Sequence, residues 1–251
     1  MNYEVDFSDN YAETKYGKIF YKQHKGAEKS SPIIFIHGLG ADTRSWLRTV
    51  DSLVDNLDIY LIDLLGHGKS DAPNIDYKVN VQVSVLREFI EKLDINPIIV
   101  GHSYGGWVTA LYASLYDTQA IVLEDSAGFY NEDHSKNTYG EKEILYKKVM
   151  QLAGNHDYVI KSIINSDNTE FYLNKEILSK IKTPTLIVWG RDDETVSIDI
   201  GRKLNEYIIG SKLTIIENAG HVSHYSQSEI FSKTLTEFLQ FLKGKQKSKQ
   251  C

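Results

Sequence analysis

A serine with glycine two positions before it and two positions after it occurs in GHSYGG at 101–106. Small residues at those places let a strand turn sharply into a helix, and the turn pushes the hydroxyl of Ser103 outward at the end of the strand. The same turn directs the backbone N–H of Tyr104 to the start of the helix, where amide donors have no partner. This pattern predicts that Ser103 is a nucleophile.

A serine hydroxyl is a poor nucleophile until a base removes its proton. Of the eight histidines in the chain, we choose His221 as the base, because it follows the last predicted strand in NAGH at 218–221. His224 is the nearby competitor. The pair His221-x-x-His224 also resembles part of a metal site, but no further ligand cluster completes one. We expect the other histidines to pack in glycine-rich turns or to lie at the surface: His37, His67 and His102 in turns, His24, His134 and His156 at the surface.

An acid is needed to hold the imidazole tautomer and to stabilise the imidazolium ion. The turn that follows the predicted strand at 185–189 supplies Asp192 and Asp193. An acid there gives the order serine, acid, histidine along the chain, which is typical of one class of serine hydrolases. Asp193 is our first choice, and Asp192 and Asp125 stay open as alternatives.

An oxyanion forms when a serine attacks a carbonyl, and it needs hydrogen-bond donors. The turn HGLG at 37–40 follows another predicted strand, and the N–H of Leu39 can face Ser103. Together with the N–H of Tyr104 it makes a predicted two-donor oxyanion hole. The glycine-rich stretch DLLGHGKS at 63–70 lacks the spacing of nucleotide-binding loops, so we do not expect nucleotide binding.

The elements that must position these residues are short apolar runs, each ending just before a turn or motif. The runs, rich in Ile, Val and Leu, lie at 32–36, 57–62, 97–100, 120–123, 185–189 and 213–216. They lack polar alternation, which indicates strands buried on both faces of a parallel sheet. Ligands bind at the carboxyl ends of such strands. The shared placement of the candidate residues at these ends therefore predicts a single site.

Helical patterns alternate with the strands, which predicts a doubly wound, mostly parallel α/β sheet. The helical faces lie at 81–93, 107–115 and 230–242. We expect a hydrolase core over 1–126 and 181–251, a small inserted helical cap over 127–180, and a disordered tail over 243–251. The segments near 3–7 and 18–22 predict an antiparallel hairpin at one edge.

Composition excludes several classes of protein. The net charge is −6, so the chain repels nucleic acid on average, and we expect no nucleic-acid partner. The only cysteine, Cys251, cannot form an intramolecular disulfide. No apolar stretch has the length of a membrane span, and the first residues do not read as a signal peptide, so we expect a cytoplasmic protein. We expect a monomer or a homodimer.

Five motifs together resemble the α/β-hydrolase superfamily, in its serine-nucleophile, carboxylesterase-like branch. They are HGLG at 37–40, DLLGHGKS at 63–70, GHSYGG at 101–106, WGRDD at 189–193 and NAGH at 218–221. The resemblance covers about 18–242, and it implies an eight-stranded α/β-hydrolase fold. In that family the acid usually lies three residues after the glycine of the WGxxD-like turn, which favours Asp193. The proline that often follows is absent, and the segment reads TVS at 195–197.

The sequence therefore predicts a serine esterase that needs no cofactor and no metal. Aromatic side chains of the cap and core suggest an apolar pocket for a short or medium acyl ester. They are Phe129, Tyr130, Tyr139, Tyr146, Tyr158, Phe171 and Tyr172, with Trp46 and Trp107 expected near the same cavity. The alternatives are a C–C bond hydrolase of a ring-cleavage dienoic acid, which would need Arg44, Arg48 or Arg191 over the pocket, and a low-turnover ligand receptor on the same fold.

Overall fold

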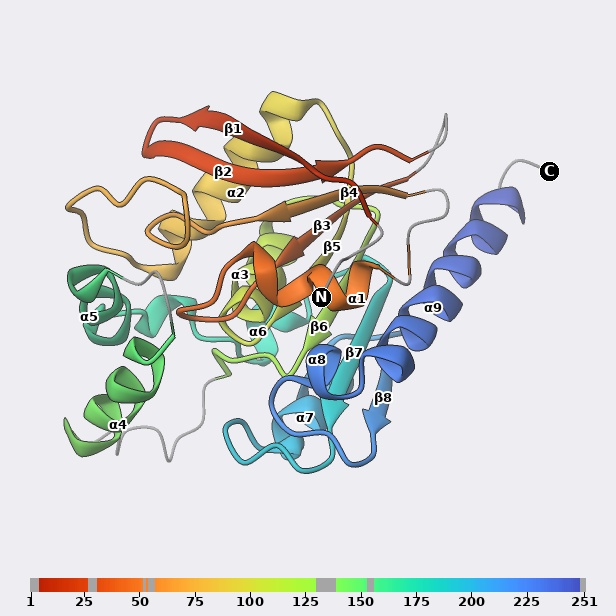
Figure 1. Cartoon of the computed structure of the whole chain (residues 1–251). Helices are drawn as coiled ribbons and strands as arrows, with labels where there is room; N and C mark the ends of the chain where they lie inside the picture. Colours follow the sequence, from red (N-terminus) through yellow and green to blue (C-terminus); the bar gives the residue numbers. More distant parts are fainter. Residues whose placement is uncertain are drawn as a thin grey trace.

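The computed structural model describes residues 5–26, 31–51, 53, 57–129, 139–152 and 156–248. An eight-stranded sheet forms its centre, with the strand order β1-β2-β4-β3-β5-β6-β7-β8 (Figure 1). The strands are β1 (Ser8–Thr14), β2 (Gly17–His24), β3 (Ser31–Ile36), β4 (Leu57–Ile62), β5 (Ile98–His102), β6 (Ala120–Glu124), β7 (Thr185–Gly190) and β8 (Lys212–Ile216). Neighbouring strands from β4 to β8 pair in parallel, whereas β2 is antiparallel to both β1 and β4. The predicted mostly parallel, eight-stranded sheet is confirmed.

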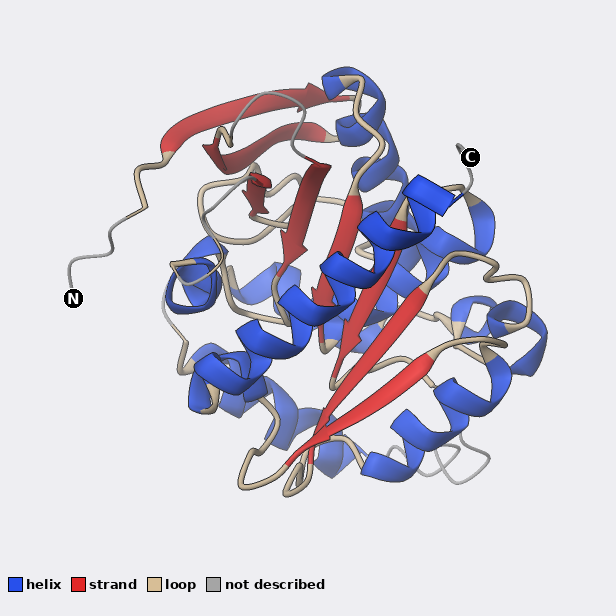
Figure 2. Ribbon diagram, turned by 90° about the vertical axis from the view of Figure 1, so that its right-hand side faces the viewer, coloured by secondary structure: helices blue, strands red, loops and turns tan. Residues whose placement is uncertain are grey.

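Helices cover both faces of the sheet (Figure 2). The helical elements are η1 (Thr43–Trp46), α1 (Leu47–Val50), α2 (Val79–Leu93), α3 (Tyr104–Leu115), α4 (Tyr139–Met150), α5 (Asp157–Asn165), η3 (Thr169–Phe171), α6 (Lys175–Leu178), α7 (Ile198–Tyr207), α8 (Ser223–Ser226) and α9 (Ser228–Ser248). The helices predicted at 81–93, 107–115 and 230–242 correspond to α2, α3 and α9.

Two hydrophobic clusters form because successive strand residues point to opposite faces of a sheet. In β3, Ile34 and Ile36 pack on the face that α2 and α3 cover, and Ile33 and Phe35 pack on the face that α1 and α9 cover. All four side chains are fully buried. Burial on both faces explains why the parallel strands read as continuous apolar runs.

The first strand of the amino-terminal hairpin begins later in the chain than the sequence predicts. An antiparallel hairpin is present, but its first strand is β1 at Ser8–Thr14 and not the segment near 3–7. Most side chains of β1 are exposed or half-buried. An edge strand with the sequence SDNYAET has no apolar face that a pattern search would detect.

The carboxyl-terminal helix also differs from the prediction. The chain was expected to be disordered from residue 243, but α9 continues to Ser248. Lysine and glutamine are good helix formers, so the lysine-rich sequence extends an existing helix without needing an apolar stripe. Cys251 lies outside the described residues.

The chain between β6 and β7 leaves the sheet and packs α4, α5, η3 and α6 beside its carboxyl edge (Figure 1). Hydrogen bonds join this segment to the start of α2 and to the residue two positions before it: Tyr77 N–H donates to Ser162 Oγ over 3.0 Å, and Val79 N–H donates to Asn168 Oδ1 over 2.9 Å. His134, which the sequence places at the surface, lies outside the described residues.

Candidate active site

Ser103 lies in a sharp turn between β5 and α3. Its backbone has φ 51° and ψ −113°, a conformation that costs energy for a residue with a side chain. The turn is possible because glycines flank it. A Cβ on Gly101 would lie 2.3 Å from the carbonyl oxygen of Gly105, and a Cβ on Gly105 would lie 2.5 Å from that of His37. The Ser103 N–H donates to the carbonyl of Glu124 over 2.9 Å, which fixes the turn to β6.

Three predicted residues form one hydrogen-bonded chain. The distance from Ser103 Oγ to His221 Nε2 is 2.9 Å, and from His221 Nδ1 to Asp193 Oδ2 it is 2.8 Å. The Asp193 side chain is fully buried, and that of His221 is 18% exposed. The second carboxylate oxygen of Asp193 accepts the N–H groups of Thr195 and Val196 over 2.7 and 3.0 Å. These contacts aim one oxygen of Asp193 at the imidazole.

The two alternative acids do not contact His221. Asp192 is exposed, and its backbone N–H donates to Ala219. Asp125 follows β6 and is fully buried, but its Oδ1 accepts the N–H of Gly190 over 2.8 Å. The structure thus brings Asp193, and neither alternative, to the imidazole.

Asp125 is held as a neutral acid. Burial, followed by the neighbouring charge of Glu124, raises the pKa of Asp125 to about 9, against a usual value of 3.8. The unfolded chain releases this proton near pH 4, while the folded protein keeps it. Asp125 therefore lowers the stability of the fold progressively as the pH rises from about 4 to 9.

Replacing Asp125 with asparagine should remove this pH-dependent loss of stability, because an amide cannot ionise. We expect the stability of Asp125→Asn relative to wild type to increase between pH 4 and 9, by up to about 1.4 kcal/mol per pH unit. Its melting temperature relative to wild type should rise with pH accordingly. Thermal unfolding of both proteins across this range measures it. Parallel melting profiles would show that Asp125 is ionised in the folded protein.

The turn at 37–40 lies against Ser103. A Cβ on Gly38 would lie 3.3 Å from the Cβ of Ser103. His37 fixes this turn, since its Nδ1 donates to the Gly38 carbonyl over 2.8 Å and its Nε2 accepts the N–H of Leu64 over 3.0 Å. Within the described part of the chain, the N–H groups of Leu39 and Tyr104 have no recorded acceptor. Both amides are therefore available to an incoming oxygen.

The histidines in the glycine-rich turns are buried and neutral. Burial lowers the pKa of His37, and burial lowers the pKa values of His67 and His102 to about 3. His102 Nε2 is 2.7 Å from the carbonyl oxygen of His221 and donates to it. His102, the residue before Ser103, thus holds the backbone of the histidine that contacts Ser103.

His224 contacts a carboxylate that the sequence did not identify. Its Nδ1 lies 2.7 Å from Oε2 of Glu124, and both side chains are buried. His224 is therefore engaged away from Ser103 and does not compete with His221. A sequence signal for Glu124 did exist: it directly follows the apolar run at 120–123, where a solvated carboxylate is not expected.

The predicted aromatic residues fall into two groups. Trp107 stacks on Tyr172 with ring centroids 5.2 Å apart, and its Nε1 donates to the Phe171 carbonyl over 2.9 Å. Trp46 was expected near the same cavity, but it is fully buried on the α9 face and stacks on His224 at 4.0 Å. The Trp46 prediction is wrong because its ring packs in the core between Phe35 of β3 and Phe231 of α9. Tyr130 lies outside the described residues.

The three arginines considered for a second carboxylate all have partners. Arg44 pairs with Asp42 at 2.6 Å, and Arg191 pairs with Glu217 at 2.6 Å. Arg48 lies over the ring of Tyr225 at 5.6 Å. None of these contacts directs a guanidinium at Ser103.

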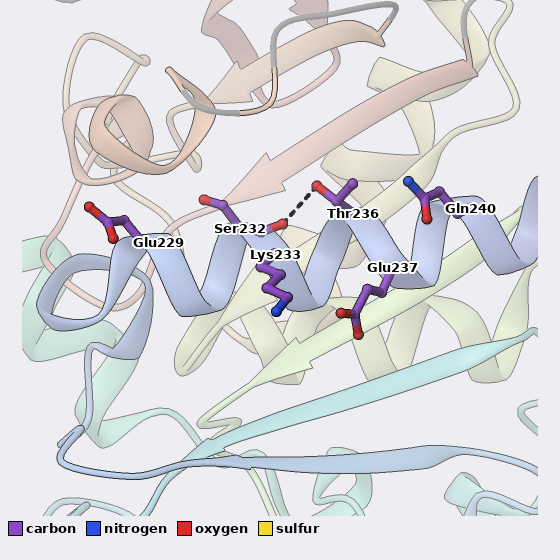
Figure 3. Close-up of a pocket in the computed structure, with 6 residues that line it drawn as sticks. All are labelled: Glu229, Ser232, Lys233, Thr236, Glu237 and Gln240. Atoms are coloured by element: carbon purple, nitrogen blue, oxygen red, sulfur yellow. Dashed lines mark hydrogen bonds between the residues drawn. The ribbon is translucent and has the colours of Figure 1, made fainter.

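A hollow of about 450 Å³ lies along α9 and shares no residue with this site (Figure 3). It is lined by Glu229, Ser232, Lys233, Thr236, Glu237 and Gln240, all from one helix. The lining side chains carry charges of both signs but include no serine paired with a base. The hollow therefore does not offer the chemistry of the Ser103 site.

Comparison with known proteins identifies the relatives of this chain. It is 28% identical over 249 residues to 2-hydroxy-6-oxo-6-(2'-aminophenyl)hexa-2,4-dienoic acid hydrolase of Metapseudomonas resinovorans, with 85% of each chain covered. It is 27% identical over 228 residues to Lipase 3 of Moraxella sp. (strain TA144), covering 76% of this chain and 71% of the lipase. The solved structure of bromoperoxidase from Bacillus anthracis has the same fold, with a TM-score of 0.77, 24% identity and coverage of 93% of this chain and 100% of that one.

The family itself follows from a match along most of the sequence. The family model described as the alpha/beta hydrolase family matches residues 33–234, which include the turns that carry Ser103, Asp193 and His221. Its relatives include lipases and other hydrolases, which supports a hydrolase activity. The chain belongs to the alpha/beta hydrolase family.

Proposed function

We propose that this protein is a serine esterase that cleaves carboxylic esters of short to medium acyl chain through an acyl-enzyme intermediate. The observation that carries the proposal is the hydrogen-bonded chain from Asp193 through His221 to Ser103, with distances of 2.8 and 2.9 Å. The similarity to a lipase adds support, because lipases cleave esters.

The mechanism follows from the protonation states that this series of hydrogen bonds requires. The Asp193 carboxylate accepts a hydrogen bond from the Nδ1–H of His221, which leaves Nε2 unprotonated and able to take the proton of Ser103. Ser103 Oγ forms a bond to the ester carbonyl carbon, and the carbonyl electron pair moves to its oxygen. When the oxyanion collapses, the bond to the alkoxy oxygen breaks, and His221 gives its proton to the leaving alcohol. Water then repeats both steps on the acyl-enzyme and releases the carboxylic acid.

In this proposal the oxyanion accepts hydrogen bonds from the N–H groups of Leu39 and Tyr104. Two features support the assignment: Gly38 lies against Ser103, and Tyr104 begins α3, where the helix dipole favours negative charge. Each such donor is typically worth about 10²–10³ in rate.

We further propose that the segment 127–180 acts as a cap that bounds the acyl pocket. The stacked rings of Trp107 and Tyr172 support this, because they join α3, directly after the nucleophile, to the segment between β6 and β7. Flat aromatic surfaces of this kind suit an apolar acyl chain.

C–C bond hydrolysis of a dienoic acid is the second candidate, because one relative carries that activity in its name. The arginine contacts weigh against it, since Arg44 and Arg191 are paired with carboxylates. A low-turnover receptor would use the same fold but would not need an aligned base.

No described helix is long and apolar enough to cross a membrane. The cytoplasmic location and the oligomeric state stay predictions.

The test is hydrolysis of p-nitrophenyl esters from acetate to long chains, before and after treatment with a fluorophosphonate. We expect turnover to be highest with short or medium chains and to be lost when one phosphonate is attached per chain at Ser103. Turnover of a dienoic ring-cleavage product without ester turnover would favour the second candidate. Tight binding of an ester without turnover would favour the receptor.

A further inference from the structure

Glu124, the last residue of β6, places a carboxylate inside the protein beside the loop of His221. Its side chain is fully buried, and three hydrogen-bond donors surround it. Oε1 accepts from Ser223 Oγ over 2.5 Å and from the His224 N–H over 2.7 Å, and Oε2 accepts from His224 Nδ1 over 2.7 Å. Both partners belong to the first turn of α8, which begins two residues after His221.

This carboxylate is ionised. Burial alone would raise the pKa of Glu124, but the hydrogen bonds that His224 and Ser223 donate to its carboxylate oppose burial and hold that pKa below its usual value. A buried anion is stable only when its oxygens are well hydrogen-bonded. The first turn of α8 therefore cannot move without uncovering a charge.

The same residue also contacts the turn of the nucleophile. The backbone carbonyl of Glu124 accepts the N–H of Ser103 over 2.9 Å. On the other side, His102 Nε2 donates to the carbonyl of His221 over 2.7 Å. The ring of His102 is a neighbour of both other rings: its centroid lies 5.1 Å from that of His221 and 5.0 Å from that of His224. Glu124 thus connects to Ser103 through its backbone and to the residues after His221 through its side chain.

We propose that Glu124 is a positioning residue, whose buried carboxylate holds Ser223 and His224 so that the imidazole of His221 stays between Ser103 and Asp193. The kinetic part of this inference rests on the proposed esterase function. The structural part concerns the geometry of His221 and can be measured without a substrate.

Glutamine at position 124 disrupts this arrangement although its size is nearly the same. The Ser223 hydroxyl and the His224 N–H require an acceptor, so the amide oxygen must face them and the amide NH₂ must face His224 Nδ1. His224 would then carry its proton on Nε2, which is buried and has no acceptor among the described residues. The amide therefore leaves a donor unpaired in either orientation, which favours movement of the first turn of α8.

Proton NMR of histidine-labelled protein reports directly on the hydrogen bonds of the histidine rings. A proton shared with a carboxylate in a short hydrogen bond resonates far downfield. We expect two such signals in the wild type, from His221 and from His224, with the His221 signal assigned by its loss in Asp193→Asn. In Glu124→Gln the His224 signal should disappear, and the His221 signal should broaden or weaken through faster exchange with water.

Ester kinetics provide the second measurement. We expect kcat of Glu124→Gln to fall about 30- to 100-fold, because small displacements of a catalytic group have effects of this size. KM should change less than about threefold, since substrate contacts remain. Ser223→Ala removes one hydrogen bond and little packing, so it should give a smaller loss of kcat with an intact fold. Ser226→Ala is the matched control, because Ser226 lies in the same helix and its hydroxyl donates to Val222 and not to Glu124.

The outcomes separate the two proposals. A folded Glu124→Gln protein with an unchanged His221 signal and wild-type kcat would overturn the positioning role and leave the esterase function standing. A wild type without Ser103-dependent ester turnover would overturn the esterase function, and the NMR signals of the Glu124 and Ser223 variants would still decide the positioning role. Loss of the His221 signal in Ser226→Ala would also overturn it, because that loop would then be unstable without any change at Glu124.

Discussion

Replacing Ser103 with alanine should reduce kcat/KM for p-nitrophenyl esters by about 10⁵-fold or more, because the acyl-enzyme cannot form without the hydroxyl and loss of a nucleophile in comparable triads has effects of this size. The methyl group of alanine fits the space, and the Ser103 N–H and carbonyl contacts stay in place, so the melting temperature should change little. Steady-state kinetics and thermal unfolding of the same preparation measure both quantities.

Ser114→Ala is a suitable control for this variant. Ser114 lies on α3, the helix that follows Ser103, and its hydroxyl donates to the Leu111 carbonyl over 2.8 Å, within the helix itself. It should keep wild-type kinetics. Ser103→Ala with more than a tenth of wild-type turnover would show that hydrolysis proceeds without this nucleophile, and the proposed mechanism would have to be abandoned.

Asparagine at position 193 should lower kcat by about 10⁴-fold, mainly through the wrong tautomer of His221. One oxygen of Asp193 accepts the N–H groups of Thr195 and Val196, so the amide oxygen of asparagine would take that place. The amide NH₂ would then face His221 Nδ1 as a donor, and the imidazole proton would move to Nε2. In that tautomer His221 cannot accept the proton of Ser103.

The adjacent Asp192 provides the matched control for this substitution. It is exposed and does not contact His221, so Asp192→Asn should keep kcat within about twofold, as is usual for surface changes. Kinetics of the two variants with the same ester discriminate between the neighbours. A large loss in Asp192→Asn with a normal Asp193→Asn enzyme would assign the acid to Asp192.

Most of the fold could be predicted because the parallel strands are buried on both faces. A strand such as β4 has no polar alternation, and its predicted bounds, 57–62, agree with the structure. The edge strand β1 could not be found in this way, since most of its side chains are exposed or half-buried and form no apolar pattern. The last turns of α9 were missed because helix propensity, rather than an apolar pattern, extends that helix.

The residues that meet at Ser103 could be named because each ends a strand, and parallel strands end at the same edge of a sheet. Glu124 also ends a strand, but its partner could not be named from that position. Its partner His224 lies 100 residues further along the chain, and the contact depends on how α8 packs behind His221. Spacing in a sequence reports neighbours on one helix or strand, and it carries little information about contacts between two distant loops.

The strand order also determines when the site can exist during folding. His221 lies 118 residues after Ser103, and it reaches Ser103 only after β7 and β8 have joined the sheet. β8 forms one edge of the sheet and leaves the ribosome after the other seven strands of that sheet. Contacts between such distant segments close late, because loop entropy must be overcome first. In the proposed mechanism, the reactivity of Ser103 therefore depends on the addition of β8 to the sheet, and we expect no reaction from a chain that has collapsed around the earlier strands alone.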